Sequence, residues 1–364
     1  MILRKMNLRN FRNYAELELR LSESCNFFVG DNAQGKSNLL EAVHVLGLTR
    51  GFRTSADRDL IRLGCTSYEI SGEFVDELQV RHLTGICYDQ ERGKEASLDR
   101  KHMPSTSWVG KFPMVLFSPE CHKITSGPPS ERRRFVDILL CQSSPAYLAD
   151  LMEYNRVLRQ RNALLTQPES GTASNLMAWS QALAVFGCRI TSARLKFVKD
   201  YEHILAQSYQ HISGSSLPFA LTYRTQFQSE EITPEKFLRL LQNAHSHEER
   251  RKRTQVGPHF DEFTFEIAGK DLRKYGSRGE QKSALVALKL AETFYLKSRT
   301  GTAPIILLDD LASELDGNRL RSARNYFYGN GQLMISSTAD ISQGFEHPFQ
   351  SYRISDGALQ PLSH

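Results

Sequence analysis

The sequence predicts an α/β fold in which a helical insertion interrupts the core of strands and helices. Short runs of β character fill the first third of the chain, around a single helical segment. From about residue 125 to about residue 250, apolar residues recur at three- and four-residue steps, the period of amphipathic helices. After Pro258, short apolar strands alternate with helices again.

The length of the chain sets the number of domains that we expect. It has 364 residues, and domains usually contain roughly 100–200 residues each, so about two domains fit. We place the two parts of the α/β domain at residues 1–124 and 253–364, with the helical lobe at 125–252 between them.

The first part of the α/β domain contains one expected helix among several strands. Residues 16–21 alternate polar and apolar side chains, which predicts a half-buried strand, and residues 26–29 form a short apolar strand. Leu39, Leu40 and Val43 have helical spacing within a helix at 37–47. Further strands are expected around Ile70, at 83–88 and at 114–117.

Residue spacing also predicts the helices and strands of the lobe and of the second part of the α/β domain. Helices are expected from Tyr147 to Leu165 and from Trp179 to Leu205. A third is expected after Thr233 and through Leu241, because Pro234 suits a first helical position. Loops are expected at 167–174 and 212–217. The last segment should contain strands at 263–267, 304–308 and 332–336 and helices at 279–297 and 317–328.

Composition excludes several classes of protein. No apolar run approaches the roughly 18 residues of a membrane helix, and the first residues do not resemble a signal peptide, so we expect a cytoplasmic protein. Six cysteines without a C-x-x-C pair favour reduced thiols over a zinc site. The net charge of +5 is compatible with a polyanionic partner but does not identify one.

A glycine-rich segment between the expected strand at 26–29 and the helix at 37–47 fits the pattern G-x-x-x-x-G-K-[ST] without a gap. Such glycines let the backbone curl so that successive N–H groups point at phosphate oxygens. In this pattern the lysine reaches the β- and γ-phosphates and is catalytic, while the hydroxyl residue ligates Mg²⁺. The flanking strand and helix argue against a chance match. The expected ATP-binding residues are Gly30, Asp31, Asn32, Ala33, Gln34, Gly35, Lys36 and Ser37.

An apolar strand ending in two acids, Asp309 and Asp310, supplies the carboxylates that such a nucleotide site requires. Asp309 is the expected carboxylate on the side of the Mg²⁺ ion, and Asp310 is placed to orient or deprotonate the attacking water. A buried strand that runs into a turn is the alternative interpretation. Far more residues separate Lys36 from Asp309 than separate these two motifs in small GTPases. This long insertion therefore argues against a small GTPase and narrows the choice of nucleotide-binding family.

Residues 275–281 resemble the signature motif of ABC-type ATPases, a Ser-x-Gly element at the start of a helix. A helix N-terminus offers free N–H groups and partial positive charge, which suit a γ-phosphate. The resemblance implies that Ser277 and Gly279 contact ATP bound to the other copy of a dimer. A helix cap followed by a turn is the alternative. Residues 313–316 similarly resemble the D-loop of these ATPases.

The combination of motifs resembles the RecF family of SMC-like ATPases over nearly the whole chain. Segments in the order found in that family are 8–14, 117–120, 128–137, 256–259 and the signature segment. The resemblance implies an ABC-type, Rad50-like ATPase head with a compact helical lobe, and it makes Arg12 a nucleotide contact. It also implies ATP-dependent homodimers, slow hydrolysis with Mg²⁺, and binding to double-stranded DNA at gap junctions.

The same resemblance implies a role in recombinational gap repair and in the maintenance of replication forks. The expected partner is RecR, acting with RecO to load RecA.

Two segments depart from the patterns of these families. Residues 259–262 read His-Phe-Asp-Glu where the RecF family usually has an arginine and two aspartates, and residues 336–338 are Ser-Ser-Thr where ABC transporters have a histidine. Because a hydroxyl cannot act as an imidazole does, we expect a weak, DNA-stimulated ATPase that acts as a switch.

Other functions remain as alternatives. A nucleotide-binding subunit of another ABC-type system that does not act on DNA, such as a transporter, would be expected to carry the histidine. A long-armed SMC protein would need heptads that are absent here, and a scaffold could bind ATP without hydrolysing it. Basic residues that could contact DNA, or form solvated helix faces, are Arg50, Arg53, Arg58, Arg62, Arg132 to Arg134, Arg156, Arg159, Arg161 and residues 250–253.

Overall fold

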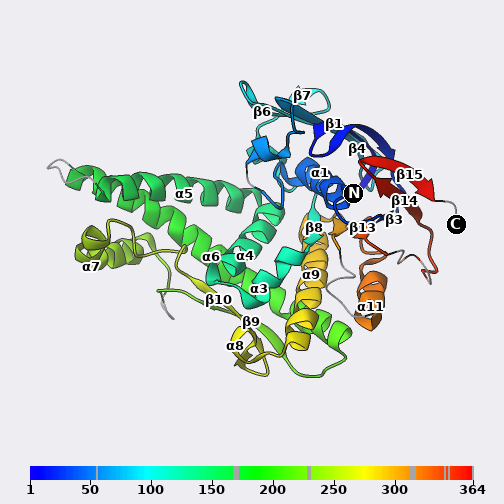
Figure 1. The fold of residues 1–364 in the computed structure, drawn as a ribbon. Helices are drawn as coiled ribbons and strands as arrows, with labels where there is room; N and C mark the ends of the chain where they lie inside the picture. Colours follow the sequence, from blue (N-terminus) through cyan, green and yellow to red (C-terminus); the bar gives the residue numbers. More distant parts are fainter. Residues whose placement is uncertain are drawn as a thin grey trace. The chain divides into compact units, whose positions relative to one another are not determined.

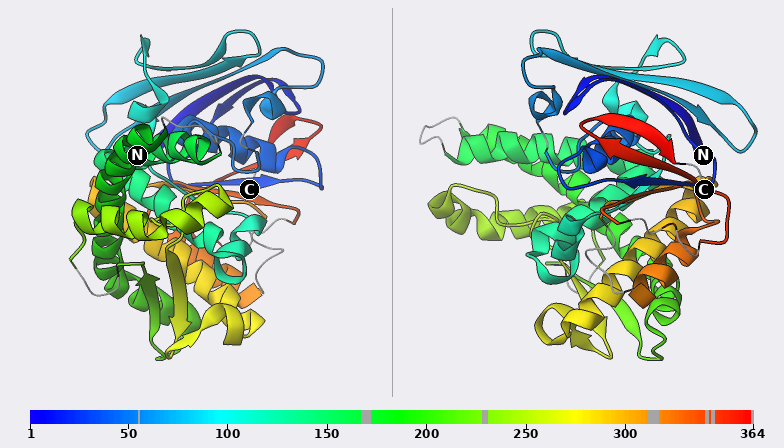
Figure 2. Two further views of the ribbon diagram at one scale, coloured as in Figure 1. Left: turned by 90° about the vertical axis from the view of Figure 1, so that its left-hand side faces the viewer. Right: turned by 45° about the vertical axis from the view of Figure 1, so that its right-hand side comes forward.

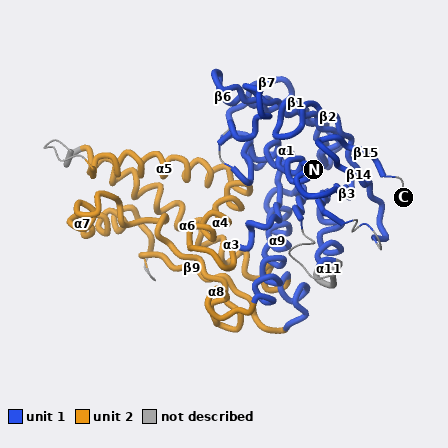
Figure 3. The backbone as a smooth tube through the Cα atoms, in the orientation of Figure 1, with its two compact units in different colours: residues 1–122, 208–215, 278–364 blue, residues 123–207, 216–277 orange. Residues whose placement is uncertain are grey.

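The computed structural model describes residues 1–54, 56–166, 172–227, 231–310, 317–339, 342 and 345–362 (Figure 1). These residues group into two compact units (Figure 3). The first unit contains residues 1–122, 208–215 and 278–364, and the second contains 123–207 and 216–277. The domain boundaries at 124 and 252 stay a prediction.

A six-stranded sheet with a parallel core lies at the centre of the first unit. Its strand order is β15-β14-β3-β13-β12-β8, and only the β14–β15 pair is antiparallel. Strands β3, β12 and β13 are buried along their whole length, as expected for a parallel sheet covered on both faces. The bounds are β3 Cys25–Val29, β8 Met114–Phe117, β12 Ile305–Leu308, β13 Leu333–Ser337, β14 Gln350–Ser355 and β15 Ala358–Leu362.

A second, antiparallel sheet of the first unit has the order β2-β1-β4-β5-β6-β7. Helix α1 (Lys36–Leu48) lies between the two sheets (Figure 2). Its residues Leu39, Leu40 and Leu46 belong to one core with residues of both sheets. Helices α9 (Arg278–Thr300) and α11 (Gly317–Phe327) lie on the other side of the parallel sheet. The remaining strands are β1 Ile2–Phe11, β2 Tyr14–Arg20, β4 Ser67–Val75, β5 Arg81–Asp89, β6 Gly93–Leu98 and β7 Lys101–His102.

The second unit is mainly helical and also contains the three-stranded sheet β11-β10-β9. Its helices are α3 His122–Ser126, α4 Pro129–Ser143, α5 Pro145–Leu165, α6 Thr172–Ser213, α7 Pro234–Arg251 and α8 Leu272–Tyr275, although the two units divide α3 after His122 and α6 after Gln207. Its strands are β9 Phe219–Arg224, β10 Glu262–Ile267 and β11 Lys270–Asp271. Short helices of the first unit are η1 Asp57–Leu60, α2 Ser105–Trp108 and η2 Pro119–Cys121.

The structure confirms the expected strands and helices and adds elements that the sequence analysis did not predict. Strand β9 lies inside the segment expected to be helical, where it pairs with β10. Helix α7 continues ten residues beyond Leu241, to Arg251. Helix α6 already includes residues 172–174 of the first expected loop and continues into the second, through residues 212 and 213. The hairpin β14–β15 was also not predicted. No described helix is both long enough and apolar enough to cross a lipid bilayer.

Candidate nucleotide-binding site

The predicted phosphate loop, residues 30–37, begins directly after β3, ends in the first turn of α1 and is packed tightly at two glycines. A Cβ atom on Gly30 would lie 2.4 Å from the carbonyl oxygen of Ile354. Gly35 has a φ of 111°, which side chains rarely tolerate, and a Cβ there would lie 2.5 Å from Nδ2 of Asn13. Both positions therefore require glycine, for close packing at one and for backbone conformation as well at the other.

Lys36 folds back over the phosphate loop. Its Nζ donates hydrogen bonds to the carbonyl oxygens of Gly30 and Asp31, at 2.7 and 2.6 Å. Burial lowers the pKa of Lys36, while the charges of Asp310 and Asp309 act in the opposite direction. An ammonium has three donors, and two of them bind these carbonyl oxygens. The third could therefore donate to a phosphate oxygen inside the loop.

Asp309 connects the loop to the end of β12. Its Oδ1 accepts hydrogen bonds from Oγ of Ser37 at 2.8 Å and from Oγ of Ser336 at 2.6 Å. The parallel pairing of β12 with β13 brings Ser336 alongside. Carboxylate and hydroxyl oxygens are the hard ligands that Mg²⁺ prefers, so Ser37 and Asp309 together fit this ion. Because Ser37 lies 272 positions earlier, the fold assembles this pair from distant parts of the chain.

Asp310 follows immediately and has an unusual backbone conformation. Its φ is 50°, and its N–H donates to Oγ of Ser336 at 3.0 Å. Ser336 therefore bonds to both acids, donating to the carboxylate of Asp309 and accepting from the backbone of Asp310. Among three acids whose charges raise the pKa of Lys36, Asp310 contributes most, although burial still lowers that pKa overall.

Arg12 lies in an ion-pair cluster beside the loop. Its Nε donates to Oε2 of Glu41 at 2.9 Å, and its NH1 donates to the carbonyl oxygen of Asp59 at 2.7 Å. Arg53 pairs with the same glutamate oxygen at 2.9 Å, and Glu41 is fully buried on α1. Sequence reasoning missed Glu41, although an acid on the apolar, buried face of a helix was an available signal.

The remaining predicted site residues come from segments outside the phosphate loop. Ser277 immediately precedes α9, and Gly279 lies in the first turn of that helix. These positions agree with the expected location at a helix start, and their contact with a nucleotide stays a prediction. The predicted D-loop, residues 313–316, lies outside the described residues.

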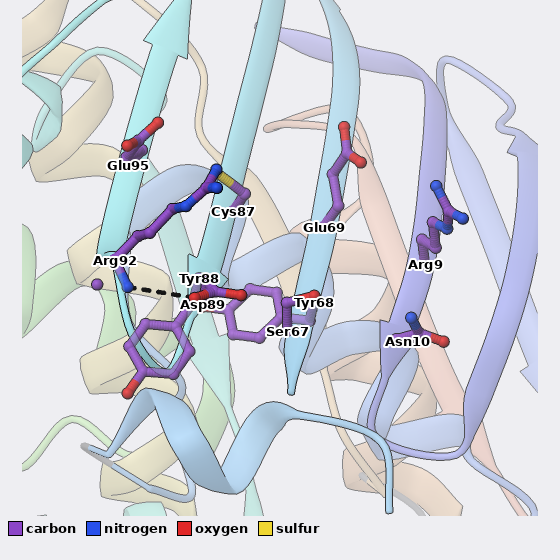
Figure 4. A pocket seen from close by; sticks show the side chains of 11 residues that line it. Arg9, Asn10, Ser67, Tyr68, Glu69, Cys87, Tyr88, Asp89, Arg92 and Glu95 are labelled. Carbon is purple, nitrogen blue, oxygen red and sulfur yellow. Dashed lines mark hydrogen bonds between the residues drawn. The ribbon is translucent and has the colours of Figure 1, made fainter. Parts of the chain in front are cut away.

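A pocket of about 400 Å³ lies on the antiparallel sheet, and Figure 4 shows its lining. The lining residues are Arg9, Asn10, Ser67, Tyr68, Glu69, Cys87, Tyr88, Asp89, Arg92, Gly93 and Glu95. None of them belongs to the phosphate loop or to the two acids after β12. Because three acids face only two arginines, the pocket does not suit a polyphosphate.

Comparisons with known proteins agree with this geometry. The sequence model described as RecF/RecN/SMC N terminal domain matches residues 2–349. The chain is 33% identical to the DNA replication and repair protein RecF of Prosthecochloris aestuarii, over 95% of this chain and 96% of that protein. The chain belongs to the RecF family. The RecF protein of Streptococcus suis is 36% identical over 93% of both chains.

Solved structures support the same assignment. A structure of the recombination mediator protein RecF with ATP in the RecFOR pathway has a TM-score of 0.91, with 29% identity over 100% of this chain and 98% of that chain. An Smc head bound to the C-terminal winged-helix domain of ScpA has a TM-score of 0.59 at 15% identity. This second likeness concerns the fold alone. Together with the family model and the RecF structure, it confirms the predicted ABC-type, SMC-like fold.

Two arginines named above as candidates for DNA contact make structural contacts within the second unit of this RecF-family chain. Arg161 is buried and donates to Glu248 at 2.7 Å, to Thr254 at 2.8 Å and to Ser180 at 2.9 Å. Arg132 is buried as well, and its Nε donates to a backbone carbonyl oxygen of β10 at 2.5 Å. The side chains of these two residues therefore have a structural role within the second unit.

The segment that departs from the RecF pattern also has structural contacts within the second unit. Nδ1 of His259 lies 2.5 Å from the hydroxyl of Tyr154, and burial lowers the pKa of His259 to about 4. Arg194 donates to the carbonyl oxygen of Pro258 at 2.7 Å and lies 3.8 Å from Asp261. Phe260, which stands among them, is 41% exposed.

Asp309→Asn should stabilise the nucleotide-free protein. Burial raises the pKa of Asp309 above its usual 3.8, so its contribution to stability is complete below pH 3.8 and is lost as the pH rises through the raised value. Asparagine keeps an oxygen acceptor for both serine hydroxyls but never ionises. In thermal unfolding with EDTA, the variant should have the higher Tm at pH 7.5, and the difference should shrink as the pH falls. An equal or lower Tm at pH 7.5 would contradict this account.

Proposed function

We propose that the chain is an ATP-dependent switch of DNA replication and repair. The observation that carries the proposal is the hydrogen bond between Ser37 and Asp309, with the Lys36 ammonium beside the same loop. Residues 30–37 would hold the triphosphate, and Arg12, from the neighbouring ion-pair cluster, would contact the nucleotide. Mg²⁺ would be held by Ser37 and Asp309 and would neutralise part of the charge on the β- and γ-phosphate oxygens.

In the proposed reaction, water attacks the γ-phosphorus atom and the bond to the β-phosphate oxygen breaks. Asp310 orients the water and takes up its proton, and the products are ADP and inorganic phosphate. Lys36 stabilises the charge on the transferred phosphoryl group. The hydroxyl of Ser336 donates a hydrogen bond to Asp309, so it does not take the place of the histidine of ABC transporters in hydrolysis. This agrees with slow turnover.

Ser277 and Gly279 would cap the triphosphate held by a second copy, so that ATP drives formation of a homodimer. The dimer would bind double-stranded DNA at gap junctions in the cytoplasm, and it would cooperate with RecR and RecO in loading RecA. Similarity to RecF proteins of the RecFOR pathway supports this part of the proposal. The head at 1–124 and 253–364 would carry the nucleotide, with 125–252 as the lobe.

Sizing the protein by sedimentation with ATP, with ADP and with duplex DNA tests the proposal as a whole. Dimers should form with ATP and not with ADP, and DNA should bind best to the ATP-bound protein. DNA affinity should fall steeply with salt, because phosphate contacts release counterions. Wild-type protein that stays monomeric at saturating ATP would contradict the proposed dimer.

Ser277→Arg should abolish the ATP-induced dimer and leave ATP binding by the monomer largely intact. The larger, charged side chain would occupy the space that the γ-phosphate of the second copy requires at the start of α9. Ser298→Arg, near the C-terminal end of α9, is the matched control and should still dimerise. Dimers of normal affinity in Ser277→Arg would remove the signature segment from the proposed interface.

A further inference from the structure

The phosphate loop is held at Gln34 by a turn from the other end of the chain. The backbone N–H of Asp356 donates to Oε1 of Gln34 at 2.6 Å, and the N–H of Gly357 donates to its carbonyl oxygen at 3.3 Å. Nδ2 of Asn13 donates to that same carbonyl oxygen at 3.1 Å. Three donors from two distant segments thus fix one residue of the loop.

The turn that provides two of these donors has little conformational freedom. Asp356 and Gly357 connect β14 to β15, since Ser355 pairs with Ala358, and their φ values are 48° and 76°. Two positive φ values are typical of a two-residue type I′ hairpin, for which Asp-Gly is a preferred sequence. A Cβ atom on Gly357 would lie 3.1 Å from the carbonyl oxygen of Asn13, so the turn also fits closely against its neighbour.

The hairpin is anchored beside the strand that leads into the loop. Strand β14 pairs in parallel with β3, and Arg353 stands opposite Val29, the last residue of β3. The carbonyl oxygen of Ile354 is the group that leaves no room for a side chain on Gly30. The hairpin therefore lies against the loop at two positions, Gly30 and Gln34.

The hairpin formed by β1 and β2, near the N-terminus, also holds the phosphate loop. Asn13 and Tyr14 follow β1, and the hydroxyl of Tyr14 donates to the carbonyl oxygen of Gly35 at 3.0 Å. Oδ1 of Asn13 accepts from Nδ2 of Asn38 on α1 at 2.7 Å. The carbonyl oxygens of Gln34 and Gly35 are thus occupied by fixed donors. A phosphate-binding loop depends on the direction of its peptide groups, and these bonds hold two of them.

We infer that Gln34 and the Asp356–Gly357 turn are positioning elements for nucleotide binding: the C-terminal hairpin pre-organises the phosphate loop before a triphosphate arrives. This inference rests on the proposed function, since it assumes that the loop binds a nucleotide. A loop already held in its binding conformation loses less conformational freedom when the ligand binds, and its affinity is higher for that reason.

The test measures binding of a non-hydrolysable ATP analogue with Mg²⁺ to Gln34→Ala. Loss of one hydrogen bond should weaken binding about threefold to tenfold. Turnover should show KM rising by more than kcat falls, and the Tm without nucleotide should stay near the wild-type value. Gln360→Ala, an exposed glutamine of the same hairpin outside the turn, is the matched control and should bind normally.

Gly357→Ala perturbs the same contact from the side of the hairpin and should also weaken binding. If the two residues act through one contact, the double variant should bind little worse than the weaker-binding single variant. Fully additive losses would overturn the inference, and so would unchanged affinity in Gln34→Ala. In hydrogen exchange, the nucleotide should slow exchange at Asp356 and Gly357 in the wild type, and no change there would also count against it.

The outcomes separate this inference from the proposed function. If the wild type and Gln360→Ala bind no nucleotide, the proposed function is wrong and the inference falls with it. If both bind and Gln34→Ala binds equally well, only the role of the hairpin is excluded. Weaker binding in both Gln34→Ala and Gly357→Ala, with normal binding in Gln360→Ala and an unchanged Tm for Gln34→Ala, supports both.

Discussion

Lys36→Arg will lower the rate of ATP turnover about 100-fold or more, a loss comparable to removing a donor that stabilises developing charge. Nζ of Lys36 lies within 2.7 Å of two loop carbonyl oxygens, in a space that suits a compact ammonium. A guanidinium is planar and wider, and it cannot take the same position among the phosphates. The measurement is steady-state release of phosphate with and without duplex DNA.

Lys111→Arg makes the same exchange at an exposed lysine of the same unit and is the control for folding and handling. It should retain wild-type turnover. If Lys36→Arg hydrolysed ATP as fast as this control, the assignment of the phosphate loop would be wrong. DNA should stimulate the wild type, which would distinguish a DNA-dependent switch from a scaffold that binds ATP as a structural ligand.

Asp310→Asn should have the second large effect, a loss of turnover of roughly 10²- to 10⁴-fold, the range typical of general bases. An amide can still orient a water molecule through hydrogen bonds, but it cannot accept the proton. Nucleotide binding should persist, because Ser37, Asp309 and Lys36 are unchanged. ATP-bound dimers should therefore accumulate and be visible by sedimentation.

Asp309→Asn gives the matched comparison because it changes the neighbouring acid in the same way. That variant should lose affinity for Mg²⁺ and bind ATP more weakly, whereas Asp310→Asn should bind ATP normally and fail only in hydrolysis. If the two variants showed the same defect, the separate roles assigned to the two acids would be refuted. Normal turnover in Asp310→Asn would exclude it as the base.

The parts of the site that sequence predicted are those encoded by short, local patterns. The strand, glycine loop and helix around Lys36 lie within about 25 consecutive residues, and the two acids directly follow four apolar residues. The hydrogen bond between Ser37 and Asp309 could be expected only once both motifs were assigned to one site. Its distance and the contribution of Ser336 come from the pairing of β12 with β13.

The parts that were missed depend on contacts between distant segments. Glu41 and Arg12 are 29 positions apart, and nothing in either segment indicates that one ion pair joins them. Strand β9 was not predicted because it lies between helices in the sequence. Its pairing partner, β10, begins 38 residues after β9 ends, so no local pattern indicates the pairing. For the C-terminal hairpin, a local signal was present, since Asp356-Gly357 between two short runs is typical of a type I′ turn.

The most direct test of the central claim is an equilibrium titration of the wild-type protein with ATP, in Mg²⁺ and in EDTA. The account predicts saturable binding of one nucleotide per chain, tighter with Mg²⁺, and loss of that Mg²⁺ dependence in Asp309→Asn. Absence of saturable binding, or equal affinity with and without Mg²⁺, would contradict it.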